Sequence, residues 1–181
     1  SISAITTSYE TALDCSEAGI KPIEGISFNA KLNWGFDGVD EIDDNLSAIK
    51  GKGAALLREK VMAKMCRHYI LIGDENKKVK TLGERTKVPI EVIPMALNLV
   101  KSELSFMGYK DLVLRQSGTG KHGPTVTESG NLIIDVGLNN IDQELDSKIK
   151  NIVGVIDTGL FIGFAQEGLI SDGTKVQQIL K

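Results

Sequence analysis

The sequence contains few of the residues that build disulfide frameworks, metal sites or nucleophilic triads. It has two cysteines, Cys15 and Cys66, and two histidines, His68 and His122. The cysteines have neither the number nor the spacing of a disulfide framework or a zinc site. Neither histidine has a serine or cysteine partner in a recognised catalytic arrangement. We therefore expect a reducing, cytoplasmic setting, no metal centre and no covalent nucleophile.

Long hydrophobic runs and an excess of one charge sign are also missing. No apolar run approaches the roughly 20 residues that span a bilayer, and the first residues lack the layout of a signal peptide. The 21 lysines and arginines nearly balance 24 aspartates and glutamates, which gives a net charge of -3. No global field would then attract nucleic acid or a membrane surface. An anionic ligand would have to be held by a local site.

The remaining composition is that of a globular protein. Hydrophobic residues make up 41% and charged residues 25% of the 181 positions, a length that suits one domain or two small ones. Strand and helix signals alternate, which favours an α/β fold. We predict helices over 11–18 and 54–67, and strands over 20–26, 32–36 and 69–74. A middle section predicts strand 88–93, helix 94–107, strands 111–115 and 131–136, helix 142–150 and strand 153–161. Its β-α-β-β-α-β order is that of a split βαβ plait, and residues 168–180 are expected to return to the first sheet.

Acidic residues follow the apolar strand 32–36 directly. Carboxylates at the end of such a strand lie where open α/β sheets place their ligands. A solvated turn or a divalent-cation loop is the alternative, although the spacing does not fit an EF-hand. The five acids are Asp37, Asp40, Glu41, Asp43 and Asp44.

Glu59 is the second candidate, because a helical wheel of residues 54–67 places it at the margin of the apolar face rather than on the polar side. It is either an ion-pair partner of Arg58 or Lys60, or a carboxyl withdrawn from water. Withdrawal raises the pKa of a carboxyl toward neutrality, as a general base requires. The wheel puts Ala55, Met62, Cys66 and Ala63 on the apolar face and Lys60, Lys64 and Arg67 on the polar stripe.

A glycine loop, Lys50-Gly51-Lys52-Gly53, precedes the same helix. Glycines let backbone N–H groups approach an anion, but the loop is neither a Walker A motif nor a dinucleotide fingerprint. A second glycine-rich run, residues 117–123, lies between two predicted strands, and we interpret it as a hairpin connection. Four further side-chain predictions are structural. His68 is expected to contact the last carbonyls of the helix, and the aromatic residues Trp34, Phe36 and Tyr69 are expected in the core.

Several runs in fixed order resemble ribose-5-phosphate isomerase, type A, over nearly the whole chain. They are Asp37-Gly38-Val39-Asp40-Glu41, Lys50-Gly51-Lys52-Gly53-Ala54-Ala55-Leu56-Leu57-Arg58-Glu59-Lys60, Asp74 with Lys77, Val88-Pro89-Ile90-Glu91-Val92-Ile93-Pro94, Val126-Thr127-Glu128-Ser129-Gly130-Asn131 and Gly154-Val155-Ile156-Asp157-Thr158-Gly159-Leu160-Phe161.

The resemblance implies interconversion of D-ribose 5-phosphate and D-ribulose 5-phosphate through an enediolate, as in the pentose phosphate pathway, without metal or organic cofactor. Glu59 would be the base, Asp37 and Asp40 would assist ring opening and hydroxyl proton transfer, and Lys50 would stabilise the enediolate. Substrate would also contact Gly38, Val39, Gly51, Lys52 and Gly53, and Lys77 would help hold the phosphate.

The resemblance also implies a Rossmann-like parallel-sheet domain, residues 1–85 and 164–181, with an inserted ferredoxin-like α+β domain, residues 86–163, assembled as a homodimer or homotetramer. The chain departs from the family pattern at two places: Lys52 replaces a glycine, and an N-terminal strand with a Gly-Thr-Gly-Ser-Thr phosphate loop has no counterpart. A non-catalytic sugar-phosphate-binding relic is therefore one alternative. An amino-sugar phosphate deaminase or a coenzyme A transferase relative is another.

Overall fold

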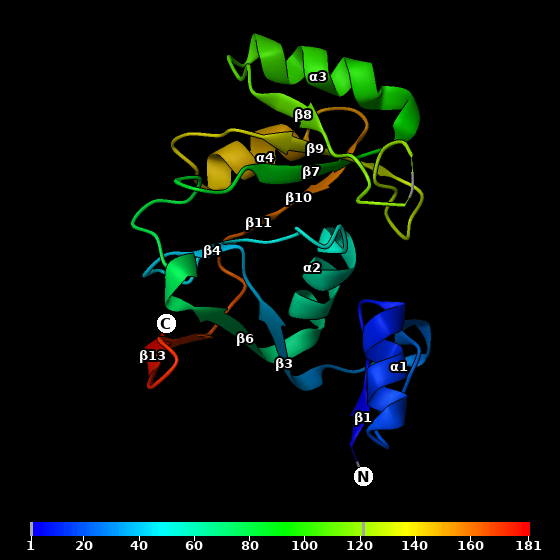
Figure 1. Cartoon of the computed structure of the whole chain (residues 1–181), viewed down its shortest axis with the longest axis vertical. Coiled ribbons are helices and arrows are strands. Elements are labelled where there is room, and N and C mark those ends of the chain that lie inside the picture. The colour runs from blue at the N-terminus through cyan, green and yellow to red at the C-terminus, as the bar shows by residue number, and fades with distance from the viewer. Residues whose placement is uncertain (1, 121) are drawn as a thin grey trace.

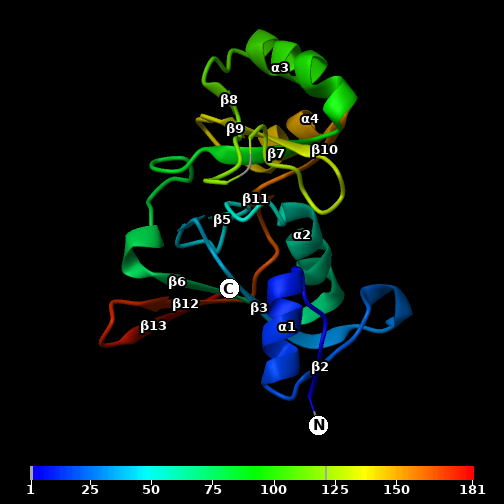
Figure 2. The ribbon, with the colours of Figure 1, turned by 45° about the vertical axis from the view of Figure 1, so that its right-hand side comes forward.

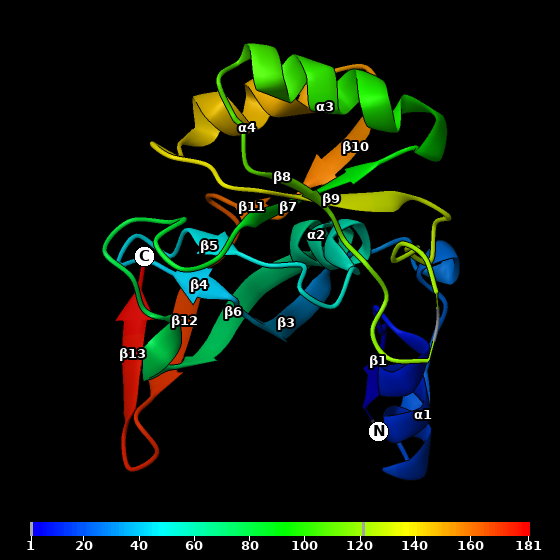
Figure 3. The same ribbon diagram turned by 45° about the horizontal axis from the view of Figure 1, so that its top comes forward.

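The chain forms a mixed α/β structure in layers, as a computed structural model shows (Figures 1 and 3). Residues 2–120 and 122–181 are described; Lys121 of the glycine-rich run 117–123 lies outside them. Two helices cover the outer face of one sheet, whose other face lies over a second, lower body (Figure 3). No helix within the described ranges is long and apolar enough to cross a membrane.

The lower body contains the parallel sheet. Its order is β13-β12-β6-β3, formed by β3 (Leu32–Gly38), β6 (Cys66–Asp74), β12 (Glu167–Ser171) and β13 (Val176–Leu180). Strand β6 pairs in parallel with β3 and β12, whereas β13 is antiparallel to β12. The predicted return of the C-terminal segment to the first sheet is confirmed.

The upper sheet is antiparallel throughout, with the order β10-β7-β9-β8. Its strands are β7 (Val88–Val92), β8 (Leu112–Leu114), β9 (Leu132–Val136) and β10 (Val155–Thr158). Helix α3 (Leu97–Phe106), after a 3-10 turn at Pro94–Ala96, and helix α4 (Gln143–Lys150) pack on one face (Figure 3). The Asp142 carboxylate caps α4 by accepting from the backbone N–H of Leu145 at 2.7 Å.

A small sheet joins the two bodies. Strands β4 (Glu41–Ile42), β5 (Ala48–Ile49) and β11 (Leu160–Phe161) form it in the order β11-β5-β4. The single strand predicted over 153–161 is therefore wrong, because β10 and β11 belong to different sheets. The break falls at Gly159, whose N–H donates to the Pro89 carbonyl at 2.7 Å. A Cβ there would lie 2.6 Å from Pro89 Cγ, so only glycine lets the chain pass this close.

The N-terminal segment forms a separate unit. Strands β1 (Ser3–Ala4) and β2 (Lys21–Pro22) pair in parallel, and α1 (Tyr9–Glu17) connects them. Ser8 caps α1, and Gly19, at φ +72°, follows its end. Only two residues of the predicted strand 20–26 are in a strand, and residues 25–27 form a 3-10 turn. Figures 1 and 2 show this unit at the end of the molecule opposite α3.

Helix α2 (Leu56–Met65) is shorter than predicted, because β6 already begins at Cys66. Its buried residues are Leu56, Lys60 and Ala63, so only Ala63 of the predicted apolar face is buried. Lys60, assigned above to the polar stripe, is 5% exposed. It donates to Asp157 Oδ1 and to the Thr158 carbonyl, both at 2.6 Å, and so joins α2 to the end of β10.

The predictions for His68 and for two aromatic residues are also wrong. His68 lies within β6, and its Nε2 is 2.7 Å from Glu167 Oε2 on β12, away from the helix end. Trp34 and Phe36 are 55% and 60% exposed and stack on each other with ring centroids 5.4 Å apart. They lie on β3, the last strand of its sheet, where less protein covers them. Tyr69 is buried in the core, as predicted.

Candidate active site

Three predicted catalytic side chains meet between the two bodies. Lys50, which follows β5, has a side chain only 3% exposed, and its Nζ lies 3.0 Å from Asp37 Oδ2 and 3.3 Å from Glu59 Oε2. The same Nζ donates to the Gly38 carbonyl at 2.5 Å. Asp37 and Gly38 come from β3 and Glu59 from the first turns of α2, so two elements hold this ammonium group.

Glu59 has the properties of a proton acceptor. Its side chain is 13% exposed. Burial raises the pKa of this carboxyl, the nearby positive charge of Lys50 opposes that effect, and the negative charge of Asp37 adds to it. Within the described part of the chain, buried Glu59 Oε2 accepts no well-aligned hydrogen bond, and its polar neighbour is the Lys50 ammonium at 3.3 Å. A carboxylate oxygen held this loosely in a low-dielectric site is suited to take a proton.

Asp37 is held in place by its neighbours. Its Oδ1 accepts from the N–H of Gly38 at 2.8 Å, and its Oδ2 accepts from the Tyr69 hydroxyl at 3.3 Å. Burial, together with the charge of Asp37, raises the pKa of Tyr69 far above its ordinary value. The hydroxyl therefore keeps its proton and serves as a donor that fixes the carboxylate.

The glycine loop after Lys50 is fixed by a residue that the sequence analysis missed. Arg115, just beyond β8, donates through Nη1 to the carbonyls of Gly51 at 2.7 Å and Lys52 at 3.0 Å. Its Nε donates to Asp135 Oδ2 on β9 at 2.9 Å, and its Nη2 donates to Asp135 Oδ1. Asp135 is the one charged residue in the predicted strand 131–136, which was a usable signal.

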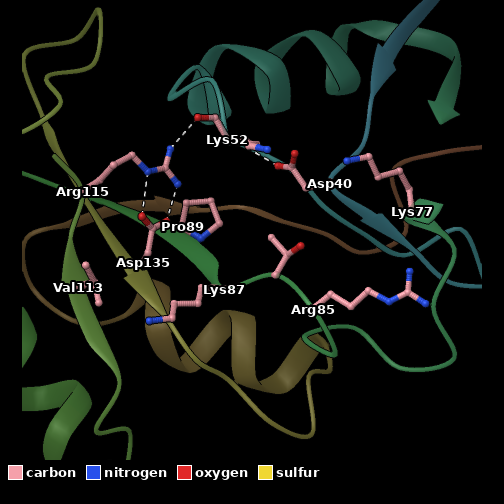
Figure 4. A pocket seen from close by; sticks show the side chains of 10 residues that line it. Asp40, Lys52, Lys77, Arg85, Lys87, Pro89, Val113, Arg115 and Asp135 are labelled. Atoms are coloured by element: carbon pink, nitrogen blue, oxygen red, sulfur yellow. Dashed lines mark hydrogen bonds and ion pairs between the residues drawn. The ribbon is translucent and has the colours of Figure 1, made fainter. Parts of the chain in front are cut away.

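A cavity of about 440 Å³ opens beside this cluster (Figure 4). Three of the predicted substrate-binding residues line it: Asp40, Lys52 and Lys77. Asp40 Oδ2 accepts from the backbone N–H of Lys52 at 3.0 Å, so the acidic turn and the glycine loop are directly joined. Asp40 makes no hydrogen bond or ion pair with Lys50 or Glu59 among the described contacts, and it belongs to the cavity rather than to the buried cluster.

The other predicted residues lie close by with different environments. Gly51, at φ +104°, has no room for a Cβ, which would lie 2.9 Å from that of Leu56. At Gly53, by contrast, a Cβ would have no other atom within 4 Å, so there is open space beside this residue. The side chain of Val39 is buried in the core of the lower body, and its N–H donates to the Ile72 carbonyl at 3.2 Å. Only its backbone carbonyl remains for a ligand.

Across residues 2–120 and 122–181, no group of three or more histidine, cysteine, aspartate or glutamate side chains could hold a metal ion. What the site does contain is a buried carboxyl of raised pKa, an adjacent buried ammonium group and a cavity rich in cations. These features define an acid–base enzyme for a small anionic substrate.

Comparison with known proteins identifies the family. Residues 3–175 match the family described as ribose 5-phosphate isomerase A (phosphoriboisomerase A). The chain is 38% identical over 176 residues to ribose-5-phosphate isomerase A of Prochlorococcus marinus. This alignment covers 94% of this chain and 72% of that protein. It is 39% identical to the enzyme of Pyrococcus abyssi, over 96% of this chain and 75% of that protein. The chain belongs to the ribose 5-phosphate isomerase A family.

Comparison with solved structures supports the same family. The ribose 5-phosphate isomerase A of Methanocaldococcus jannaschii matches with a TM-score of 0.90 and 35% identity, over 98% of this chain and 77% of that one. A D-ribose-5-phosphate isomerase in complex with phospho-erythronic acid matches with a TM-score of 0.93 and 35% identity, over 99% of this chain and 78% of that one. Family membership excludes the deaminase and coenzyme A transferase alternatives.

The Arg115 contacts lead to a testable prediction. In Arg115→Met the carbonyls of Gly51 and Lys52 lose their shared donor, so the loop is held less firmly, and we expect kcat/KM to fall about tenfold or more. Arg115→Lys is the conservative variant, which keeps the charge but not the planar fork, and it should recover only part of the loss. Steady-state kinetics and thermal unfolding of both variants provide the measurement. Equal kinetics in wild type and Arg115→Met would contradict the positioning role.

Proposed function

We propose that the chain interconverts D-ribose 5-phosphate and D-ribulose 5-phosphate by proton transfer through an enediolate, with Glu59 as the base. The observation that carries this proposal is the contact of Lys50 with both Asp37 and Glu59 in a buried setting. The reaction moves hydrogen between two carbons of one molecule, so it is balanced without an external oxidant or reductant.

The roles follow from charge and position. Glu59 takes the proton from C2 of the open-chain aldose and returns it to C1, and the Lys50 ammonium stabilises the negative oxygen that forms between these steps. Asp37, oriented by Tyr69, exchanges the hydroxyl proton between O1 and O2, with Asp40 beside it at the cavity. Gly38, Val39, Gly51, Lys52 and Gly53 supply backbone and side-chain contacts to substrate, and Lys77 contacts its phosphate.

Two structural proposals accompany this function. In the first, residues 86–163 form a ferredoxin-like domain inserted into a Rossmann-like domain of residues 1–85 and 164–181. The strand order of the upper sheet and the parallel pairing of β3, β6 and β12 support this division.

The second proposal is that the protein assembles as a homodimer or homotetramer. Sedimentation equilibrium measures its mass in solution and tests this proposal.

The direct test is ketose formation from D-ribose 5-phosphate by the purified chain, followed by absorbance of the ketose product. Turnover proportional to enzyme concentration supports the proposal. A folded chain that binds the substrate and gives no ketose would instead be the non-catalytic sugar-phosphate-binding protein.

The pH dependence of kcat/KM follows from the direction of the Glu59 pKa shift. The base works as a carboxylate, so activity is present above the Glu59 pKa and is lost as pH falls through it. Because burial raises that pKa above 4.5, we expect the acid limb at a higher pH than an exposed glutamate would give. A pH–rate profile locates the limb. An acid limb at or below 4.5 would contradict Glu59 as the base.

A further inference from the structure

One buried aromatic ring lies against two buried ammonium groups. Phe161, the last residue of β11, is 0% exposed and belongs to the core of the lower body. Over its ring, Nζ of Lys50 lies 5.4 Å and Nζ of Lys60 lies 5.1 Å from the centroid. A cation within about 6 Å of a ring centroid is attracted to the negative face of the ring, most strongly where water is excluded. Phe161 is therefore an electrostatic partner of both lysines.

The small sheet fixes the ring relative to Lys50. Strand β11 pairs with β5, which places Phe161 opposite Ala48. One step along, the backbone N–H of Lys50 donates to the Gly159 carbonyl at 2.9 Å. The Lys50 carbonyl passes so close to Gly159 that no Cβ would fit between them. The two backbones are held together at this point, so the ring and the ammonium group stay neighbours.

Four groups surround the Lys50 ammonium. Its Nζ donates to the Gly38 carbonyl at 2.5 Å and lies 3.0 Å from Asp37 Oδ2. Glu59 Oε2 is more distant, at 3.3 Å, and accepts no well-aligned hydrogen bond among the described residues. The face of the Phe161 ring is the fourth group. The ring and the Glu59 carboxylate thus attract the same buried cation, and the carboxylate has the looser of the two carboxylate contacts.

We propose that Phe161 is a positioning residue of the active site, whose ring holds the Lys50 ammonium short of a tight hydrogen bond with Glu59. A charge-assisted hydrogen bond would stabilise the carboxylate and make it a poorer base. The ring leaves Lys50 close enough to stabilise the enediolate and leaves Glu59 basic enough to take a proton. This inference rests on the proposed function, because it deepens the roles given there to Lys50 and Glu59.

The groups that face Glu59 set the direction of the pH effect. Lys50 follows β5, Asp37 ends on β3, Asp40 lies in the turn after β3, and Tyr69, which keeps its proton, comes from β6. Burial raises the pKa of Glu59, the charge of Lys50 lowers it, and the charges of Asp37 and Asp40 raise it. An ammonium group that moves toward Glu59 therefore lowers the pKa of this carboxyl from its raised value.

Fluorinated phenylalanine, introduced at position 161 alone, tests the proposal. Each ring fluorine weakens the negative face and leaves the shape of the ring nearly unchanged. We expect trifluorophenylalanine to lower kcat for D-ribose 5-phosphate about threefold to tenfold, with KM within about twofold of wild type. Monofluorophenylalanine should give an intermediate kcat. The acid limb of the kcat/KM profile should move to lower pH, which a loss of packing alone would not produce in a ring of unchanged shape.

The same replacement at Phe164 is the matched control. Its ring tilts against that of Phe161, with centroids 5.3 Å apart, and Nζ of Lys64 lies 4.7 Å from its centroid. Lys50 does not lie over this ring among the described contacts. Fluorination of Phe164 should therefore leave kcat within about twofold of wild type.

A carboxyl titration gives a readout that needs no turnover. Carbon NMR of the chain labelled in glutamate follows the Glu59 carboxyl, whose signal is identified by its loss in Glu59→Gln. The pKa of Glu59 should be lower with trifluorophenylalanine at position 161 than in wild type. Thermal unfolding of each protein verifies that it is folded.

The proposal is overturned if the pKa of Glu59 stays equal or rises in the fluorinated protein, or if kcat does not change. An equal fall of kcat on fluorination of Phe161 and of Phe164 also overturns it. A folded wild-type chain that forms no ketose refutes the proposed function, and the carboxyl titration then still decides whether the ring restrains Lys50.

Discussion

Glu59→Gln is expected to lower kcat by about a hundredfold to ten-thousandfold, with a much smaller change in KM. Glutamine keeps the shape of the side chain but cannot accept a proton, and loss of a general base costs a rate factor of this order. The Oε2 atom that accepts no well-aligned hydrogen bond in the resting site is the atom whose function is removed. Ketose formation from D-ribose 5-phosphate, measured at several substrate concentrations, gives both constants.

Stability separates this catalytic role from a structural one. Since folding raises the pKa of Glu59, the folded state favours the protonated form. Ionised Glu59 therefore lowers the free energy of unfolding as pH rises through its folded pKa. Glutamine removes this penalty, so the variant should unfold at the same temperature as wild type or a higher one at pH 8. A variant that lost stability together with activity would count against the assignment.

Lys60→Met is expected to have the largest effect on stability, a loss of about 3 kcal/mol or more. The Lys60 and Asp157 side chains are 6% and 13% exposed, with Nζ and Oδ1 2.6 Å apart. Burial lowers the pKa of Lys60, while the charge of Asp157 opposes that shift. Burying the two charges costs free energy, and removing one of them leaves the other buried without its partner, which costs more. Without the ammonium group, the described partners left to Asp157 Oδ1 are the Thr158 N–H at 2.8 Å and the Lys150 Nζ at 3.8 Å. Urea unfolding measures the loss.

Two controls make the Lys60 result interpretable. The double variant Lys60→Met, Asp157→Leu removes both charges, and it should recover a large part of the stability because no uncompensated charge stays buried. Lys148→Met breaks the exposed pair with Glu144 on α4 and should leave the unfolding midpoint unchanged. If the double variant is no more stable than Lys60→Met, the loss comes from packing rather than from the orphaned carboxylate.

The parts of the site that could be predicted are those carried by local sequence. The acids after an apolar strand and the glycine loop before a helix led to Asp37 and Lys50. The helical wheel left Glu59 as either an ion-pair partner of Arg58 or Lys60 or a withdrawn carboxyl; the side chain is 13% exposed, and its ion-pair partner is Lys50. The mixed α/β class and the β-α-β-β-α-β order of the middle section were likewise readable from alternating local signals.

Other features depend on partners distant in the chain. Arg115 reaches the carbonyl of Gly51, 64 residues earlier, and Lys60 reaches Asp157, 97 residues later. The helical wheel of α2 placed Lys60 on the polar face because it classes every lysine as polar. It contains no information about Asp157, the distant carboxylate that pairs with Lys60 in the buried region. For the same reason, Trp34 and Phe36 were assigned to the core by type, although their strand lies at the edge of its sheet.

The pairing of β12 with β6 has a consequence for the order in which the molecule folds. Residues 88–158 contain all four strands of the upper sheet in one continuous stretch, so that sheet can pair as soon as it leaves the ribosome. Strand β6 can pair with β3 early, but its other edge stays open until β12 is made, since the paired residues Ile70 and Glu167 are 97 residues apart. The lower body, and with it the turn after β3, therefore consolidates only after β12 has been synthesised. The upper sheet of a nascent chain should become protease-resistant before the lower body does.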